Sequence, residues 1–318
     1  MTDSCVHCGL CTKACTFLQK YDLDLALFAQ HPELAYHCFL CGECSRVCPR
    51  GIDGRALSLA MRRGQAQANG GKLSEPGYGA LIAEKKNYLF RNYRRAQGKT
   101  ALFPGCNFPS FFPKTTDVLV RLLGDVGIGT VYDCCGKPMG DLGLEEESRI
   151  ADNLCRRLRD ADIQRLVVLC PNCYYYLKSH LDIEIISIYE LLEEMGIGRV
   201  LTGKAAPLFL PCPDRDTGDL LRRLSHFLPD AAPIEGVQCC GLGGCASGKE
   251  PEIAASFAQK VGSQHHSTVY TYCASCAGQL RRGGVEGATH VLTEILATHE
   301  KPALSGAQSL WNRARRVL

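Results

Sequence analysis

Residues 129–136 read GTVYDCCG, and residues 235–241 read EGVQCCG. In each stretch a short run containing valine leads to a cysteine doublet that is followed by glycine. From residue 100 onward five cysteines occur in the same order twice, and corresponding positions lie 103 to 106 residues apart. The first set is Cys106, Cys134, Cys135, Cys170 and Cys173, and the second set is Cys212, Cys239, Cys240, Cys273 and Cys276. A repeat with matching internal spacing predicts two similar domains, each of which contributes five thiols.

The cysteines of both repeats follow short aliphatic or β-branched runs. TALFPGC, GTVYDCC and RLVVLC predict strands in the first repeat, and APLFLPC, EGVQCC and STVYTYC predict strands in the second. Between them, residues 115–127, 144–162, 217–228 and 251–264 have apolar residues three and four apart, which indicates amphipathic helices. Alternating strands and helices favour a parallel sheet, in which ligands gather beyond the carboxyl ends of the strands. We therefore expect all ten cysteines at those ends.

Five thiols in each repeat are one more than a tetrahedral zinc site or a cubane iron–sulfur cluster needs. We therefore expect a centre with more open iron geometry in each repeat. The glycine after each doublet is consistent with a tight turn that lets the backbone approach a bulky cluster, and GLGGCASG at 241–248 offers more such glycines. Cys155 and Cys245 lie outside both sets, and we expect both to be structural. Dithiol exchange at Cys170 and Cys173, and a zinc-holding scaffold, remain alternatives.

The first 60 residues contain two further groups of four cysteines, both spaced CxxCxxCxxxC. Two-residue gaps let three thiolates of one loop bind one cubane [4Fe-4S] cluster, while the fourth cysteine usually ligates the neighbouring cluster. We therefore predict two crossed sets of ligands. One set is Cys5, Cys8, Cys11 and Cys48, and the other is Cys38, Cys41, Cys44 and Cys15. A structural zinc site needs two CxxC pairs and fits this spacing poorly.

The segment between these two loops, residues 17–37, has the apolar spacing of helices. The N-terminal part of the chain resembles a helical dicluster ferredoxin. It departs from that pattern at one position, because Thr16 stands where a proline often follows the fourth cysteine.

Composition bears on the compartment of the protein. The chain of 318 residues contains 20 cysteines, which in a secreted protein would suggest disulfides. The first residues show no basic segment followed by an apolar run, and no stretch approaches the length of a membrane span. We therefore expect a cytoplasmic protein with reduced thiols, which would reach the inner face of a membrane only through a partner. The net charge of +3 is too small to indicate a nucleic-acid partner.

A basic stretch, KKNYLFRNYRRAQGK at 85–99, separates the first eight cysteines from the remaining twelve. We interpret it as a solvated linker helix, with a docking surface for an acidic partner or for lipid head groups as the alternative. The predicted domains are a dicluster domain at 1–65, a basic linker at 66–99, and two repeats at 100–203 and 204–318.

The tandem five-cysteine pattern resembles the CCG domain of the heterodisulfide reductase family, and the order of the domains is similar to that family's D subunit. The resemblance covers nearly the whole chain. It implies an α+β multidomain fold, in which a helical dicluster ferredoxin domain precedes two tandem α/β, Rossmann-like CCG domains. It also implies two noncubane [4Fe-4S] clusters, one on each five-cysteine set, where a disulfide is bound and cleaved, in addition to two cubane [4Fe-4S] clusters on the first eight cysteines.

Two functions follow from this resemblance. In the first, the protein is an enzyme or catalytic subunit that passes electrons from the two cubane clusters to noncubane centres, which reduce a disulfide or oxidise thiols. In the second, it is a non-catalytic iron–sulfur subunit of a flavin-dependent hydroxy-acid or glycerol-3-phosphate dehydrogenase and delivers electrons to a quinone. The chain has no GxGxxG motif after a predicted strand, so a flavin or nicotinamide would be bound elsewhere. Both functions require a redox partner, such as a flavoprotein, a hydrogenase or a membrane cytochrome or quinone protein.

Overall fold

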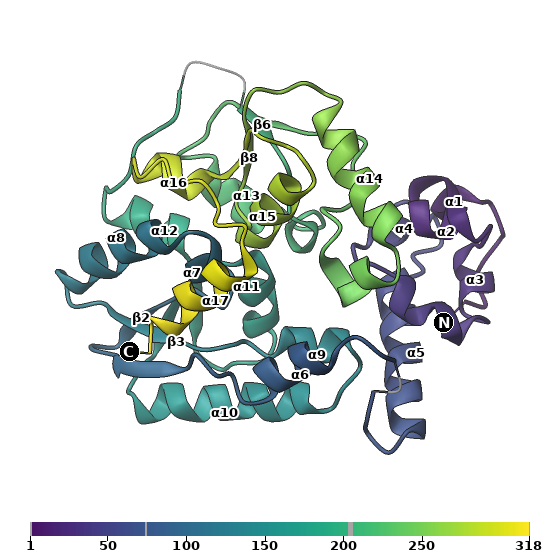
Figure 1. Ribbon diagram of the computed structural model, residues 1–318, viewed down its shortest axis with the longest axis horizontal. Coiled ribbons are helices and arrows are strands. Elements are labelled where there is room, and N and C mark those ends of the chain that lie inside the picture. Colours follow the sequence, from purple (N-terminus) through teal and green to yellow (C-terminus); the bar gives the residue numbers. More distant parts are fainter. Residues whose placement is uncertain (1, 74, 203–205, 318) are drawn as a thin grey trace. The chain divides into compact units, whose positions relative to one another are not determined.

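The computed structural model describes residues 2–73, 75–202 and 206–317, and they form two compact units (Figure 1). The first unit combines residues 1–86 with two later segments, 136–147 and 236–260. The second unit is made of residues 87–135, 148–235 and 261–318. Both later segments of the first unit come from within the two cysteine repeats. The three boundaries inferred from the sequence, after residues 65, 99 and 203, remain predictions.

The first unit consists of short helices. They are α1 (Leu10–Ala14), α2 (Thr16–Lys20), α3 (Leu25–Phe28), η1 (Pro32–His37), α4 (Glu43–Arg46), α5 (Gly54–Ala68), α6 (Gly79–Lys86), α9 (Lys137–Asp141), η3 (Gly243–Gly248) and α14 (Pro251–Gly262). The predicted helical segment 17–37 is therefore helical in three pieces. Asp24 begins α3, because its carboxylate accepts hydrogen bonds from the backbone N–H groups of Ala26 and Leu27, both at 2.9 Å. Side-chain packing joins α14 to the N-terminal helices, although they are far apart in the sequence. The rings of Phe39 and Phe257 meet edge to face, with their centroids 5.3 Å apart.

The second unit contains two sheets with the same strand order. The first sheet has the order β1-β3-β2-β4-β5, and the second has the order β7-β6-β8-β9. All neighbouring strands are parallel except β1, which is antiparallel to β3. The strands are β1 (Asn92–Arg95), β2 (Thr100–Phe103), β3 (Gly129–Tyr132), β4 (Arg165–Val168), β5 (Glu184–Ser187), β6 (Ala206–Leu208), β7 (Ala231–Pro233), β8 (Val269–Thr271) and β9 (Ala288–His290). The order β3-β2-β4-β5 thus matches β7-β6-β8-β9, and the internal repeat and mixed α/β class predicted from the sequence are confirmed.

Helices connect these strands. They are α7 (Phe108–Phe111), α8 (Pro113–Gly124), α10 (Glu146–Asp160), α11 (Pro171–Lys178), α12 (Ile188–Glu194), η2 (Cys212–Asp214), α13 (Asp219–Leu224), α15 (Ala274–Arg282), α16 (Val291–Ile295) and α17 (Gly306–Ala314). One continuous apolar core, which includes Phe103 of β2 and Leu208 of β6, runs through both sheets. No helix in the described part of the chain combines the length and hydrophobicity that crossing a membrane requires.

Two sequence expectations are wrong. The stretch EGVQCC at 235–240 forms no strand, because β7 lies upstream and ends at Pro233, and Gly236 has a left-handed φ of 74°. The basic stretch 85–99 is not a solvated linker helix either. Its residues Asn92–Arg95 form β1 at the edge of the first sheet, and Lys85 is buried at the end of α6, paired with Glu84.

Candidate functional site

The two cysteine loops of the first unit share one unusual backbone conformation. His7 and Leu40, each directly before the second cysteine of its loop, have φ values of 50° and 51°. Gly9 and Gly42, each directly after that cysteine, have φ values of 72° and 79°. Such left-handed conformations are uncommon for residues other than glycine, and alternating turns of this kind direct backbone N–H groups into a concave site. In the second loop the N–H of Leu40 lies 3.4 Å from the sulfur of Cys38.

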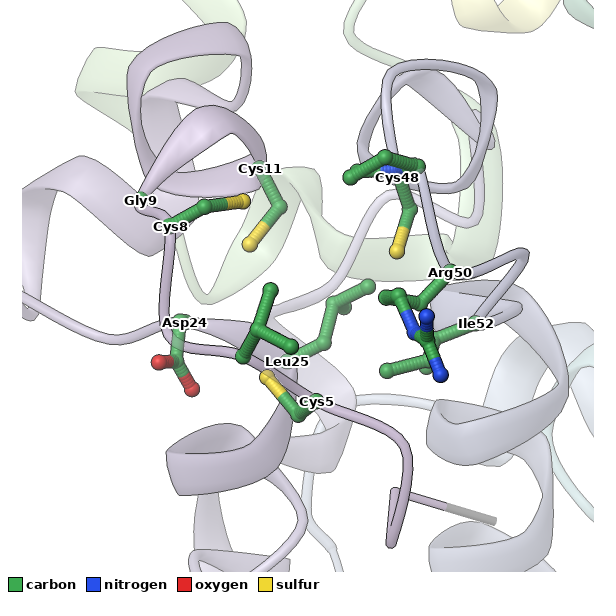
Figure 2. Close-up of a pocket in the computed structure, with 11 residues that line it drawn as sticks. Cys5, Cys8, Gly9, Cys11, Asp24, Leu25, Cys48, Arg50 and Ile52 are labelled. Atoms are coloured by element: carbon green, nitrogen blue, oxygen red, sulfur yellow. The ribbon is translucent and has the colours of Figure 1, made fainter.

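The first predicted ligand set lines a single hollow. The sulfur atoms of Cys5, Cys8, Cys11 and Cys48 surround one space, although Cys48 comes from the other loop (Figure 2). The hollow contains about 310 Å³ of atom-free volume, part of which is open to solvent. Cys11 is buried, whereas Cys8 is exposed and Cys5 and Cys48 are half-buried. This set of thiols therefore lies at the surface of the first unit.

The second predicted ligand set is buried. Burial and the neighbouring thiols Cys38, Cys15 and Cys41 raise the pKa of Cys44 well above its usual value. Burial also raises the pKa of Cys15 to about 12. Buried thiols of this kind are unreactive as nucleophiles, but metal binding deprotonates them. The structure thus brings both crossed groups of four together, and their role as ligands remains a prediction.

A buried cation lies beside the second set. The guanidinium of Arg62 on α5 is fully buried and donates to backbone carbonyls, including those of Ala35 at 2.9 Å, Cys38 at 2.8 Å and Gly244 at 2.8 Å. Among residues 2–73, 75–202 and 206–317 it forms no ion pair with a carboxylate. A buried charge without a counter-ion is costly. A cubane cluster with four thiolate ligands is an anion, so the donors and the charge in this region fit a [4Fe-4S] cluster on Cys15, Cys38, Cys41 and Cys44.

A buried carboxylate links residues 236–260 of the first unit to the N-terminal helices. The side chain of Glu250 is fully buried and accepts hydrogen bonds from Lys20 Nζ at 2.6 Å, His37 Nδ1 at 2.6 Å and Tyr21 Oη at 2.7 Å. Burial alone would raise the pKa of Glu250, but the hydrogen bonds from Lys20, His37 and Tyr21 outweigh it and lower the pKa.

The five cysteines of the first repeat lie at the carboxyl ends of three adjacent parallel strands. Cys106 follows β2, the doublet follows β3, and Cys170 and Cys173 follow β4. The sulfur atoms of Cys173 and Cys135 are 3.4 Å apart. Cys106 and Cys134 pack in one apolar cluster, and a Cβ added at Gly105 would meet the Cys173 sulfur at 3.3 Å. The structure therefore gathers the whole first set at one edge of the sheet.

A buried aspartate anchors the doublet of the first repeat. Asp133 accepts hydrogen bonds from the backbone N–H of Cys134 at 2.8 Å, from Arg91 Nε at 3.1 Å and from Arg157 Nε at 3.1 Å. Arg91 belongs to the basic stretch that the sequence assigned to a linker. Part of that stretch thus supports the five-cysteine site instead of separating domains.

The second set is distributed over the two units. Cys212, Cys273 and Cys276 lie in the second unit, whereas Cys239 and Cys240 lie in the first. Within the second unit, Asp214 accepts a hydrogen bond from Tyr272 Oη at 2.6 Å, which links the segment of Cys212 to the segment of Cys273. Within the first unit, Cys239 and Cys41 are in side-chain hydrogen-bond contact. The sequence did not predict this contact between a CCG doublet and the dicluster loops.

The CxxC motifs of the two repeats also meet. Cys170 and Cys273, which occupy corresponding positions, are in side-chain hydrogen-bond contact. A second link joins Asn107 Nδ2, next to Cys106, to Ser275 Oγ at 2.6 Å. Sequence spacing alone indicated two separate sets, whereas in the second unit parts of both sets are neighbours.

The thiols of the first CxxC motif are poor candidates for dithiol exchange. A hydrogen bond from Cys173 lowers the pKa of Cys170, but the contact with Cys273 and burial outweigh it and raise the pKa to about 12. The contact with Cys135, the contact with Cys170 and burial raise the pKa of Cys173 well above its usual value. Exchange requires an accessible thiolate of lowered pKa. The geometry thus favours the ligand interpretation for this motif.

Two glycines of GLGGCASG lie close to the backbone of the second cysteine loop. A Cβ on Gly243 would lie 2.4 Å from the carbonyl oxygen of Phe39, and one on Gly244 would lie 2.5 Å from that of Cys38. These glycines therefore allow the segment to approach the second cysteine loop, and the expectation that they also face a cluster stays a prediction.

Two residues near the predicted ligands were missed by the sequence analysis. Arg62 is one, and Gln238, whose Nε2 lies 3.6 Å from the sulfurs of both Cys15 and Cys41, is the other. Neither belongs to a cysteine-spacing motif. Only the place of Gln238 directly before a doublet, and the place of Arg62 within a helix, could have drawn attention to them.

Comparisons with known proteins agree with the order of the domains along the chain. Residues 4–52 match the family described as a 4Fe-4S dicluster domain, and residues 100–178 and 208–281 match the cysteine-rich domain family CCG. An uncharacterized iron–sulfur protein of Methanocaldococcus jannaschii is 24% identical over 330 residues, covering 87% of this chain and 67% of the relative. A subunit of the fumarate reductase (CoM/CoB) of Methanothermobacter marburgensis is 24% identical, covering 86% of this chain and 66% of the relative. An uncharacterized iron–sulfur protein of Methanococcus maripaludis is 23% identical over 87% of this chain and 67% of the relative. The chain thus spans about two thirds of the length of these relatives.

Proposed function

Because the chain belongs to the iron–sulfur proteins that resemble the heterodisulfide reductase D subunit, we propose that it reduces a disulfide, or oxidises two thiols, with electrons exchanged through a partner. In the reducing direction one disulfide, two electrons and two protons give two thiols, as the S–S bond breaks. The chain is an iron–sulfur electron-transfer protein in either direction.

The contact between Cys170 and Cys273 carries this proposal. It brings the CxxC motifs of both repeats together at the carboxyl ends of β4 and β8. A disulfide has two adjacent sulfur atoms that separate as two thiols, so two neighbouring CxxC motifs could each help to receive one of them. A protein that only relayed electrons would have no need for two five-cysteine sets, since cubane clusters would serve.

Each group of cysteines has its own part in this function. When bound, two cubane [4Fe-4S] clusters supply one-electron carriers, and two noncubane [4Fe-4S] clusters supply iron with room for a substrate sulfur. The eight N-terminal cysteines would hold the former, and the ten cysteines of the repeats would hold the latter. The remaining residues position these thiols: Asp133 holds the first doublet, and Asp214 links the segments of Cys212 and Cys273.

The surface next to the first N-terminal set is suited to a redox partner. Cys8 is exposed there, and the apolar side chains of Val6 and Leu10 are 58% and 44% exposed. Exposed apolar side chains beside a redox centre are typical of transient docking sites. One relative is named as a subunit of a reductase, which supports the proposal that this chain also works with a partner.

Anaerobic metal and sulfide analysis, followed by paramagnetic resonance during addition of disulfides or thiols, tests this function. We expect about sixteen iron atoms per chain, four in each of four clusters. We also expect a resonance signal that changes when glutathione disulfide, or the mixed disulfide of CoM and CoB suggested by the name of one relative, is added.

Two outcomes would contradict the proposal. About eight iron atoms with two zinc ions would contradict the four-cluster assignment. A full iron content without any response to disulfides or thiols would instead favour the non-catalytic subunit of a flavin-dependent dehydrogenase. The Cys155→Ser variant, which changes a cysteine outside every set, serves as the control and should behave like the unmodified protein.

A further inference from the structure

Gln238 links the doublet of the second repeat to the second dicluster set. Its side chain is 7% exposed, and its Nε2 lies 3.6 Å from the sulfurs of Cys15 and Cys41. Its Oε1 accepts hydrogen bonds from the backbone N–H of Thr16 at 2.8 Å and from Thr16 Oγ1 at 3.1 Å. All four partners belong to the first unit.

The orientation of this amide follows from its partners. If the amide were flipped, its NH₂ group would face the N–H of Thr16, and donor would oppose donor. The oxygen therefore faces Thr16, and the two N–H groups face the sulfurs. A proline at position 16 would have no N–H to offer. The departure from the dicluster pattern at Thr16 thus supplies the donor that orients Gln238.

The corresponding residue of the first repeat has a different role. Asp133 also directly precedes a cysteine doublet, but it accepts hydrogen bonds from Arg91 and Arg157. A glutamine at this position is therefore not required by the repeat itself. Its function should be sought in its contacts with Cys15 and Cys41.

We propose that Gln238 raises the reduction potential of the second N-terminal centre, held by Cys15, Cys38, Cys41 and Cys44. The inference rests on the cluster assignment in the proposed function. Reduction adds negative charge to the ligand sulfurs, so N–H groups that donate to them stabilise the reduced state. Burial of all four cysteines has the opposite effect, because a buried site disfavours the more highly charged state.

Gln238 lies where the second N-terminal centre adjoins a cysteine of the second repeat. The next residue, Cys239, contacts Cys41 through its side chain. Gln238 therefore acts at the place where the second dicluster set meets the doublet of the second repeat. Without its donors the most buried N-terminal centre would become harder to reduce at the point where it adjoins the CCG cysteines.

The Gln238→Met variant, which keeps the length of the side chain and removes both N–H groups, tests the proposal. In a potentiometric titration of the purified protein followed by paramagnetic resonance, we expect one of the two N-terminal potentials to fall. Loss of hydrogen bonds to a charged group changes an equilibrium about tenfold, which corresponds to ~59 mV for a one-electron couple. The other potential should not move.

Further variants keep the test decisive if Gln238→Met loses the cluster. Gln238→Glu preserves the shape of the side chain and its contact with Thr16 but turns an acceptor toward the sulfurs. We therefore expect the reduction potential to fall at least as far as in Gln238→Met. Thr16→Pro should lower the potential by a smaller amount, because it removes the backbone N–H that is the closer donor to Gln238 Oε1. Thr16→Val keeps this N–H and should have little effect on the potential. Gln65→Met is the matched control, since Gln65 lies on α5 and its side chain donates to the carbonyl of Pro32.

Unchanged potentials in the two Gln238 variants at full iron content would overturn the inference and leave the proposed function intact. Equal shifts of both N-terminal potentials would overturn it as well, because the effect would then be general. An iron content that lacks the N-terminal clusters in the unmodified protein would instead refute the cluster assignment itself.

Discussion

Replacing Arg62 by methionine removes a buried guanidinium that donates to four backbone carbonyls of the first unit. The acceptors are the carbonyl oxygens of Ala35, Cys38, Asp141 and Gly244. A buried acceptor that loses its donor costs about 1–3 kcal/mol, so the four together cost at least about 4 kcal/mol. Since about 1.4 kcal/mol is a factor of ten, the opening of the segments that Arg62 joins should become roughly a thousandfold more frequent.

Hydrogen exchange of the anaerobic, cluster-loaded protein measures this opening segment by segment. In Arg62→Met we expect faster exchange in η1 (Pro32–His37) and η3 (Gly243–Gly248), because Arg62 donates to carbonyls within or directly after these helices. Exchange in the second unit should change little. The method is preferable to a single denaturation midpoint, because a protein with bound clusters does not unfold in two states. If Arg62→Met does not retain its iron, Arg62→Lys keeps the charge with fewer donors and should give an intermediate effect.

The neighbouring arginine is the control. Arg63 is 54% exposed and forms an ion pair with Glu147 at 3.7 Å, which at the surface is worth less than about 1 kcal/mol. Exchange in η1 and η3 that is no faster in Arg62→Met than in Arg63→Met would refute the assignment of Arg62 as the residue that holds these segments together.

Three further predictions concern the cysteine sites and the acid stability of the first unit. Cys135→Ser should remove about four of the sixteen iron atoms and leave the N-terminal resonance signals unchanged, whereas loss of all iron would indicate misfolding. Gly54→Ala should disrupt the second N-terminal centre, because the new Cβ would lie 2.5 Å from the Cys44 sulfur. Gly64→Ala on the same helix meets no atom within 4 Å and should slow hydrogen exchange in α5 by an amount that corresponds to about 0.5–1 kcal/mol. Because the pKa of Glu250 is lowered in the folded state, its carboxylate stabilises the protein above the usual glutamate range, and this contribution is lost as the pH falls through the folded pKa. Hydrogen exchange, corrected for the effect of pH on the intrinsic exchange rate, should therefore show that Glu250→Gln increases the opening of α14 at about pH 7 and less at about pH 3, and an equal increase at both values would contradict this.

Local sequence patterns predicted most of the strands that end at cysteines. The aliphatic runs before Cys106, Cys170 and Cys273 correspond to β2, β4 and β8, because buried parallel strands are continuous apolar stretches. The patterns failed where a strand was short or displaced. β9 (Ala288–His290) has three residues and no alternation, and the valine before the second doublet lies in a loop because Gly236 turns the chain after β7.

The candidate site was predictable in its cysteines but not in its supporting residues. Regular spacing identifies ligand loops, because a cluster imposes a definite distance between successive thiols. No comparable rule exists for Arg62 or Gln238. The Cys38 carbonyl that Arg62 binds is 24 residues away in the sequence, and the sulfurs near Gln238 are 197 and 223 residues away. Their importance depends on tertiary contacts, and the sequence offered only indirect signs of Gln238, which are its place before a doublet and the threonine that replaces proline at its partner position 16.

The three-part composition of the first unit has a consequence for its biosynthesis. Residues 1–86 leave the ribosome first, but the segment that packs on Phe39 and contacts Cys41 is not synthesised until residues 236–260 follow. A nascent or truncated chain would therefore present the second cysteine loop without Gln238, Glu250 or the docking of Gly244. Insertion of iron and sulfide into that loop should be a late event, and fragments that end before residue 236 should lose this centre first on exposure to oxygen.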